Sequence, residues 1–157
     1  MTSALITATA LGIAGLGYCT VLGFIATSSH DIFLHASFGI FFTLIILLAH
    51  SMTMFYLIGK GKAVREAVTE GGLSHEFYTT VARLRRPVFS IATIAMVLTM
   101  TTSIAGGGVD TQMIPTGIHL ALALSAIVVN LMALRTEVLA MLACARIVGE
   151  VNNLLKD

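Results

Sequence analysis

Five histidines mark the positions where this chain could do chemistry, because three of them lie inside long apolar segments. These three are His35, His50 and His119, whereas His30 and His75 fall in polar connections and are expected to be solvated. An imidazole can ligate a metal ion or transfer a proton. Inside an apolar segment it also costs free energy unless it faces other protein groups and finds a partner. The three embedded histidines therefore predict metal ligation or proton transfer.

Four apolar segments carry these residues, and each is long enough to cross a bilayer. The chain has 157 residues, of which 57% are hydrophobic and only 11% are charged, and its mean hydropathy is +0.94. A soluble domain carries about 25% charged residues, and a transmembrane helix needs about 20 apolar residues. The segments lack the alternation of barrel strands. We therefore predict an all-α, integral membrane four-helix bundle in one domain, with spans at about 3–27, 32–59, 87–105 and 114–134.

The connections between the apolar segments decide the predicted orientation. They comprise residues 28–31, 60–86 and 106–110, and the glycine run at 106–108 is interpreted as a turn. All nine Lys and Arg residues lie in the 60–86 connection or after the fourth segment. Because cytoplasmic loops carry the excess of basic residues, both termini and the 60–86 connection are predicted to be cytoplasmic. The expected location is a bacterial cytoplasmic (inner) membrane.

The two cytoplasmic segments, 60–86 and 135–155, are predicted to be helical. The helix after Lys60 is expected to stop at Gly71, and Ser74 is a suitable N-cap for the next helix. The tail at 135–155 is amphipathic and about 30 Å long as a helix. Its apolar stripe is assigned to Val138, Leu142, Ala145, Val148 or Gly149, and Leu154. The extensions are expected to pack on each other, with a docking surface for a soluble partner as the alternative.

His35 and His119 are predicted to lie at nearly the same depth, near the outer face. Each is a few residues inside the outer end of its segment, and both segments descend from that face. In an up-down-up-down bundle the second and fourth helices can stand diagonally across the core, where two imidazoles can bind heme from opposite sides.

Small or polar residues continue the helix face of each of these two histidines. Such residues leave clearance for a heme ring, and Met100 in the third segment offers an alternative axial ligand. The stripe of the second segment consists of His35, Gly39, Thr43 and Ile46, and that of the fourth consists of His119, Ala123, Ala126, Asn130 and Glu137.

This arrangement resembles the small four-helix b-type cytochromes that anchor membrane oxidoreductases. The resemblance lies in the architecture and in the depth of His35 and His119, without a sequence motif of that family. It implies a heme b between these two residues. It also implies a role as an electron carrier or heme-bearing subunit, associated with other membrane subunits or with further copies of the chain. The lack of an inner histidine pair departs from the two-heme versions.

His50 lies about 22 Å deeper than His35 if the segment is helical. No second histidine is expected at that depth, so a second heme is not supported. Asn130 or Glu137 could hydrogen-bond His50. The three residues therefore predict either a polar relay or a structurally satisfied histidine, and the structural role is favoured.

Two other interpretations of the polar residues stay open. His30, Asp31, His35, Asp110 and His119 gather near the predicted outer face, where they could bind zinc or copper or form the mouth of a transport path. Alternatively, the protein is a non-catalytic accessory or scaffold subunit of a larger membrane complex. No GxSxG, HExxH or CxxC motif is present, so an electron-transfer or accessory subunit is favoured over a stand-alone enzyme. The net charge of +1 suggests no nucleic-acid partner.

Overall fold

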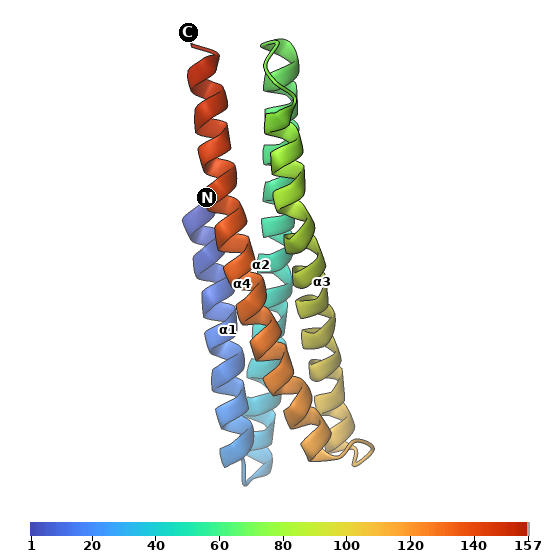
Figure 1. The fold of residues 1–157 in the computed structure, drawn as a ribbon. Helices are drawn as coiled ribbons and strands as arrows, with labels where there is room; N and C mark the ends of the chain where they lie inside the picture. The colour runs from blue at the N-terminus through green and yellow to red at the C-terminus, as the bar shows by residue number, and fades with distance from the viewer. Residues whose placement is uncertain (157) are drawn as a thin grey trace.

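The computed structural model describes residues 1–156, and four helices account for nearly all of them (Figure 1). The helices are α1 (Thr2–Ile25), α2 (Ser29–Glu70), α3 (Glu76–Asp110) and α4 (Thr116–Leu154). Each is long and apolar enough to cross a membrane. The predicted all-α fold, with one apolar span in each of four helices, is therefore confirmed.

The helices lie side by side and alternate in direction (Figure 1). Each helix packs on the next along the chain, α4 returns to pack on α1, and α2 and α4 also meet across the centre. In Figure 1 the two short connections, 26–28 and 111–115, lie at one end of the bundle, here called the loop end. The opposite end, called the charged end, comprises residues 60–86 and 135–156 and contains all nine Lys and Arg residues.

The connection between the first two helices lies at 26–28 instead of the predicted 28–31, because residues 29–31 form the first turn of α2. Ser28 and Asp31 form a capping box, in which the Asp31 amide donates to Ser28 Oγ (3.2 Å) and the Ser28 amide donates to the Asp31 carboxylate (3.0 Å). This reciprocal pair satisfies amide donors that a helix start leaves unpaired. Hydrogen bonds from the Ser28 hydroxyl and the Thr27 amide lower the pKa of the Asp31 carboxyl, which precedes the apolar run.

The turn predicted at the glycine run 106–108 is wrong, because α3 continues to Asp110. The glycines there allow close contact instead of a change in direction. A Cβ added to Gly106 would lie 3.3 Å from the His119 ring, and one added to Gly108 would lie 2.6 Å from Ile114. The chain turns only after Asp110, where Gln112 adopts a φ of 59°.

Large apolar side chains cover the outside of the bundle, whereas its centre contains polar ones. The exposed residues include Phe24, Phe33, Phe55 and Ile104, which are between 66% and 73% exposed. The buried set includes threonine, histidine, asparagine and glutamate side chains. Extended apolar surfaces of this kind mark contact with a membrane or with another protein. The distribution is compatible with a bundle surrounded by lipid.

At the charged end, α2, α3 and α4 extend beyond the N-terminus of α1 and pack on one another (Figure 1). The predicted stop of α2 is confirmed, with Gly71 as its C-cap and Gly72 at a φ of 62°. α3 begins at Glu76, whose amide donates to Ser74 Oγ (3.3 Å).

The predicted apolar stripe of the α4 tail is wrong. Leu142 and Leu154 are about half exposed, at 51% and 49%. The buried stripe instead begins at Glu137, which faces the core, and therefore passes through different residues at helical spacing. It consists of Glu137, Ala140, Met141, Cys144, Ile147 and Val151.

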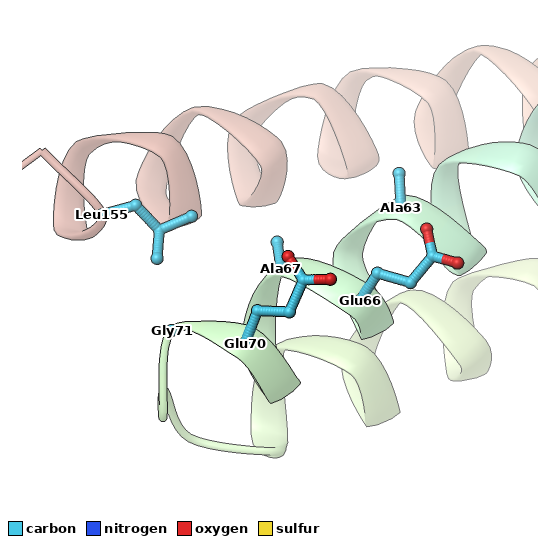
Figure 2. Close-up of a pocket in the computed structure, with 6 residues that line it drawn as sticks. All are labelled: Ala63, Glu66, Ala67, Glu70, Gly71 and Leu155. Carbon is cyan, nitrogen blue, oxygen red and sulfur yellow. The ribbon is translucent and has the colours of Figure 1, made fainter.

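A hollow at the charged end separates α2 from the last turn of α4 (Figure 2). Leu155 of α4 approaches Gly71 so closely that a Cβ there would overlap with it. The residues that line this hollow are Ala63, Glu66, Ala67, Glu70, Gly71 and Leu155. It lies at the opposite end of the bundle from His35 and His119.

Candidate functional site

The structure brings His35 and His119 together near the loop end. Their ring centroids are 6.1 Å apart, and the ring planes are nearly perpendicular, at 89°. His35 lies two turns into α2 and His119 one turn into α4, so both helices present an imidazole at the same level of the bundle. The predicted depth match and the diagonal approach of these two helices are thus observed.

The two imidazoles differ in their hydrogen bonds. His35 Nδ1 lies 2.9 Å from the Cys19 carbonyl oxygen of α1, an atom that can only accept, so Nδ1 carries the proton in the neutral ring. The Nε2 lone pair of His35 is then available. A backbone carbonyl that holds the second ring nitrogen in this way is typical of metal-ligating histidines. His119 Nδ1 is buried and has no hydrogen-bond partner within residues 1–156, so this ring has unused capacity for a ligand.

Two glycines from the remaining helices lie against this histidine pair. A Cβ added to Gly23 of α1 would lie 3.0 Å from His35 Cε1, and one added to Gly106 of α3 would lie 3.3 Å from His119 Cε1. All four helices therefore contribute to one site, α2 and α4 with imidazoles and α1 and α3 with glycines. The absence of a side chain at each glycine lets the imidazole ring approach the neighbouring helix closely.

The two imidazoles are the donor set that a bis-histidine heme needs. When two imidazoles ligate one metal ion from opposite sides, each metal–nitrogen bond is about 2 Å long. The distance from each nitrogen to the centre of its ring adds about 1 Å, so the two ring centroids are separated by about 6 Å. The observed separation of 6.1 Å agrees with that value. The unpartnered nitrogen of His119 and the two glycines are the features of this structure that fit the group.

Gly39 and Met100 are the two other residues predicted for this site. Gly39 faces open space, because a Cβ added there would meet no other residue within 4 Å. Met100 is 46% exposed and lies on the outside of α3. Gly39 is half-buried one turn beyond His35 on the same face of α2, whereas Met100 belongs to an exposed face of α3.

The alternative metal site near the loop end is not assembled. The Asp31 carboxylate caps the start of α2, and His30 and Asp110 are exposed. Within residues 1–156, no group of three or more His, Cys, Asp or Glu side chains is placed to hold a metal ion. His30, Asp31 and Asp110 therefore do not join His35 and His119 in one ligand set.

A second polar cluster lies nearer the charged end, around His50. His50 Nδ1 is 2.7 Å from Glu137 Oε1, and His50 Nε2 is 2.9 Å from Asn130 Oδ1. The Asn130 amide nitrogen in turn donates to Thr99 Oγ1 (2.9 Å) and to the Ala126 carbonyl oxygen (2.7 Å). The predicted contacts of His50 with Asn130 and Glu137 are both present. They use both ring nitrogens, so His50 is not free to ligate a metal in this arrangement.

Sequence reasoning missed Gly23, Gly106 and Thr99 as parts of these sites. A signal for the glycines was nevertheless present: His35 follows Gly23 by 12 residues and His119 follows Gly106 by 13, across a short connection in each case. In a helical hairpin, such a spacing places each glycine at the level of its histidine. Thr99 and Asn130 lie on the same two helices as Gly106 and His119, and their separation of 31 residues across the same connection carried a comparable signal.

Comparisons with protein-family models, with curated proteins and with solved structures find no match for this chain.

Proposed function

We propose that the protein is a small membrane b-type cytochrome, or the heme-bearing subunit of a membrane complex, that carries electrons near the outer membrane face. The observation that carries this proposal is the pairing of His35 with His119 at 6.1 Å, flanked by Gly23 and Gly106. A heme b held between two imidazoles supplies reversible one-electron transfer.

The chain's own residues bind and orient the heme in this proposal. The Cys19 carbonyl accepts the proton of His35 Nδ1, which fixes that ring and directs Nε2 toward the metal. His119 of α4 would supply the second nitrogen ligand. Gly23 and Gly106 allow the two imidazole rings to pack closely against α1 and α3.

The charge distribution supports the proposed orientation. All nine Lys and Arg residues lie at the charged end, which is therefore proposed to be cytoplasmic, with both termini. The histidine pair lies near the loop end and hence near the outer face. Electron exchange is accordingly proposed with a partner on that side of a bacterial cytoplasmic membrane.

The proposal is tested by the absorption spectrum of the full chain, purified in detergent after expression with added heme. The expected result is a reduced spectrum of the b type after dithionite, lost in both His35→Ala and His119→Ala. His30→Ala is the matched control, since His30 is an exposed histidine of the same helix, only five residues from His35. This control variant should keep the full spectrum. Circular dichroism and gel filtration verify that each variant is folded.

A colourless wild-type protein that remains folded and stays colourless after heme addition would refute the cytochrome proposal. Loss of the spectrum in His30→Ala, to the same degree as in His35→Ala, would also contradict the proposal, because heme binding would then not depend specifically on the assigned ligands.

A non-catalytic accessory subunit is the second candidate. It is favoured by the extension of α2, α3 and α4 beyond α1 at the charged end, where their lengths exceed what a bilayer requires. The hollow of Figure 2 lies on this extension, beside the acidic side chains Glu66 and Glu70. A soluble partner at the cytoplasmic face would dock there. A folded, heme-free protein that copurifies with other membrane subunits would favour this candidate.

A further inference from the structure

The buried cluster around His50 is independent of the proposed heme site. His50 of α2, Asn130 and Glu137 of α4, and Thr99 of α3 are between 0% and 2% exposed. His50 follows His35 by 15 residues, which corresponds to about 22 Å along a helix. None of the four residues is therefore part of the histidine pair at the loop end.

The hydrogen-bond donors of this cluster are fixed by backbone carbonyl groups, which can only accept. The Thr99 hydroxyl donates to the Ala95 carbonyl (2.8 Å), so its oxygen accepts from the Asn130 amide. The Asn130 nitrogen also donates to the Ala126 carbonyl, which identifies the other amide atom as oxygen. That oxygen accepts from His50, so His50 Nε2 must carry a hydrogen.

The remaining contact of His50 then requires one more proton. With Nε2 protonated, the Nδ1 atom of a neutral imidazole carries a lone pair, and an ionised carboxylate also offers only lone pairs. The two atoms lie 2.7 Å apart, which is a hydrogen-bond distance. A proton must therefore lie between them, either on Nδ1 as an imidazolium facing a carboxylate or on Glu137 as a carboxylic acid.

Within residues 1–156, the half-buried Arg85 of α3 is the charge that approaches the bundle interior from the charged end, where its guanidinium lies beside Gly61. From Thr2 to Gly17, α1 contains no titratable side chain, and its buried Thr9 donates to its own helix. α3 contains none from Pro87 to Ala105, and Arg135 of α4 is exposed. A pair with one shared proton is neutral overall, whereas removal of that proton leaves an uncompensated buried negative charge that costs several kcal/mol.

We propose that His50 and Glu137 form a proton-binding site inside the bundle, oriented by Asn130 and Thr99, that exchanges its proton with the charged end. Two oxygens support the direction of exchange. Glu137 Oε2 and Thr53 Oγ1 are buried and have no hydrogen-bond partner within residues 1–156. Thr53 lies one turn beyond His50 toward the charged end, and Glu137 lies two turns beyond Asn130 in the same direction. Both can accept a hydrogen bond from a water that delivers the proton.

The site is tested on the full chain in lipid nanodiscs, prepared without heme so that the result does not depend on the proposed function. Histidine labelled with nitrogen-15 reports the protons on His50 by NMR, with His50→Gln to assign the signal. Infrared spectroscopy reports the protonation of Glu137, with Glu137→Gln to assign the band. Exposed Glu66→Gln is the matched control. At neutral pH the expected result is one proton in the pair, as imidazolium with carboxylate or as imidazole with carboxylic acid. A neutral His50 beside an ionised Glu137 would overturn the proposal.

Exchange into D₂O tests the route. Thr53→Val should slow deuteration of the pair several-fold, because it removes the hydroxyl between His50 and the charged end. Thr43→Val is the matched control, since Thr43 is a buried threonine of the same helix on the loop-end side of His50. Slowing by Thr43→Val but not by Thr53→Val would contradict exchange with the charged end. A pair that never exchanges would contradict a proton-binding role and leave the cluster as a packing element.

Discussion

Asn130 connects three helices through one side-chain amide, so its replacement should measure how much the buried polar cluster stabilises the bundle. Its oxygen accepts from His50 of α2, and its nitrogen donates to Thr99 of α3 and to the Ala126 carbonyl of its own helix. Asn130→Ala therefore removes two interhelical hydrogen bonds. It also leaves the Nε2–H of His50 buried without a partner.

The expected loss follows from these two bonds. Interhelical hydrogen bonds in a membrane protein contribute about 0.6 kcal/mol each on average and up to about 1.7 kcal/mol. Asn130→Ala should accordingly lower the free energy of unfolding by about 1 to 3 kcal/mol. The upper part of this range is expected because Asn130 is fully buried, so neither lipid nor water can replace its partners.

The assay is reversible unfolding of the full chain in bicelles, followed by circular dichroism during an SDS titration. Asn152→Ala is the matched control, since it removes the same side chain from an exposed position of the same helix. This control should change the free energy of unfolding by less than about 0.5 kcal/mol. A double-mutant cycle with Thr99→Val should return a coupling of about 0.6 kcal/mol for that contact alone. Equal stability of Asn130→Ala and Asn152→Ala would refute the assignment of Asn130 as a link between helices.

Two further predictions concern the histidine pair and the orientation. Gly106→Val should reduce heme loading at least several-fold, because a Cβ added there would lie 3.3 Å from the His119 ring. The neighbouring Gly107→Val should leave heme loading unchanged, since Gly107 is exposed and a Cβ added there would meet no other residue within 4 Å. Equal heme absorbance of the two variants would contradict the assignment of Gly106 to the heme site. A membrane-impermeant maleimide should label Gln112→Cys in intact cells but Glu66→Cys only after permeabilisation. Both positions are exposed, and they lie at opposite ends of the bundle. The reverse labelling pattern would contradict a cytoplasmic charged end.

The sequence by itself determined the class of fold and the level of each histidine. Runs of apolar residues long enough to span a bilayer leave the helix as the only means of satisfying the backbone, so the four helices follow from composition and length. The helical rise then converts residue spacing into depth. This is why His35 and His119 could be placed at one level and His50 at another, with Asn130 and Glu137 as its partners.

Local capping and close packing account for the errors in the sequence-based assignment. A polar tetrapeptide at 28–31 and a glycine run at 106–110 look like breaks, but the first caps a helix and the second admits neighbouring side chains. The apolar stripe of the α4 tail was misplaced for a related reason. The buried stripe continues from Glu137, which contacts His50 in the core, whereas the predicted stripe included Leu142 and Leu154, which are about half exposed.

Only the tertiary structure decided which atoms face each other. The contacts of Gly23 with His35 and of Gly106 with His119 depend on how closely neighbouring helices approach, and spacing along the chain does not specify that distance. The proton shared by His50 and Glu137 follows from a series of hydrogen bonds that starts at the Ala95 and Ala126 carbonyls. Such a series joins three helices. It exists only once their rotations and heights are fixed together, because each hydrogen bond requires a particular direction and distance.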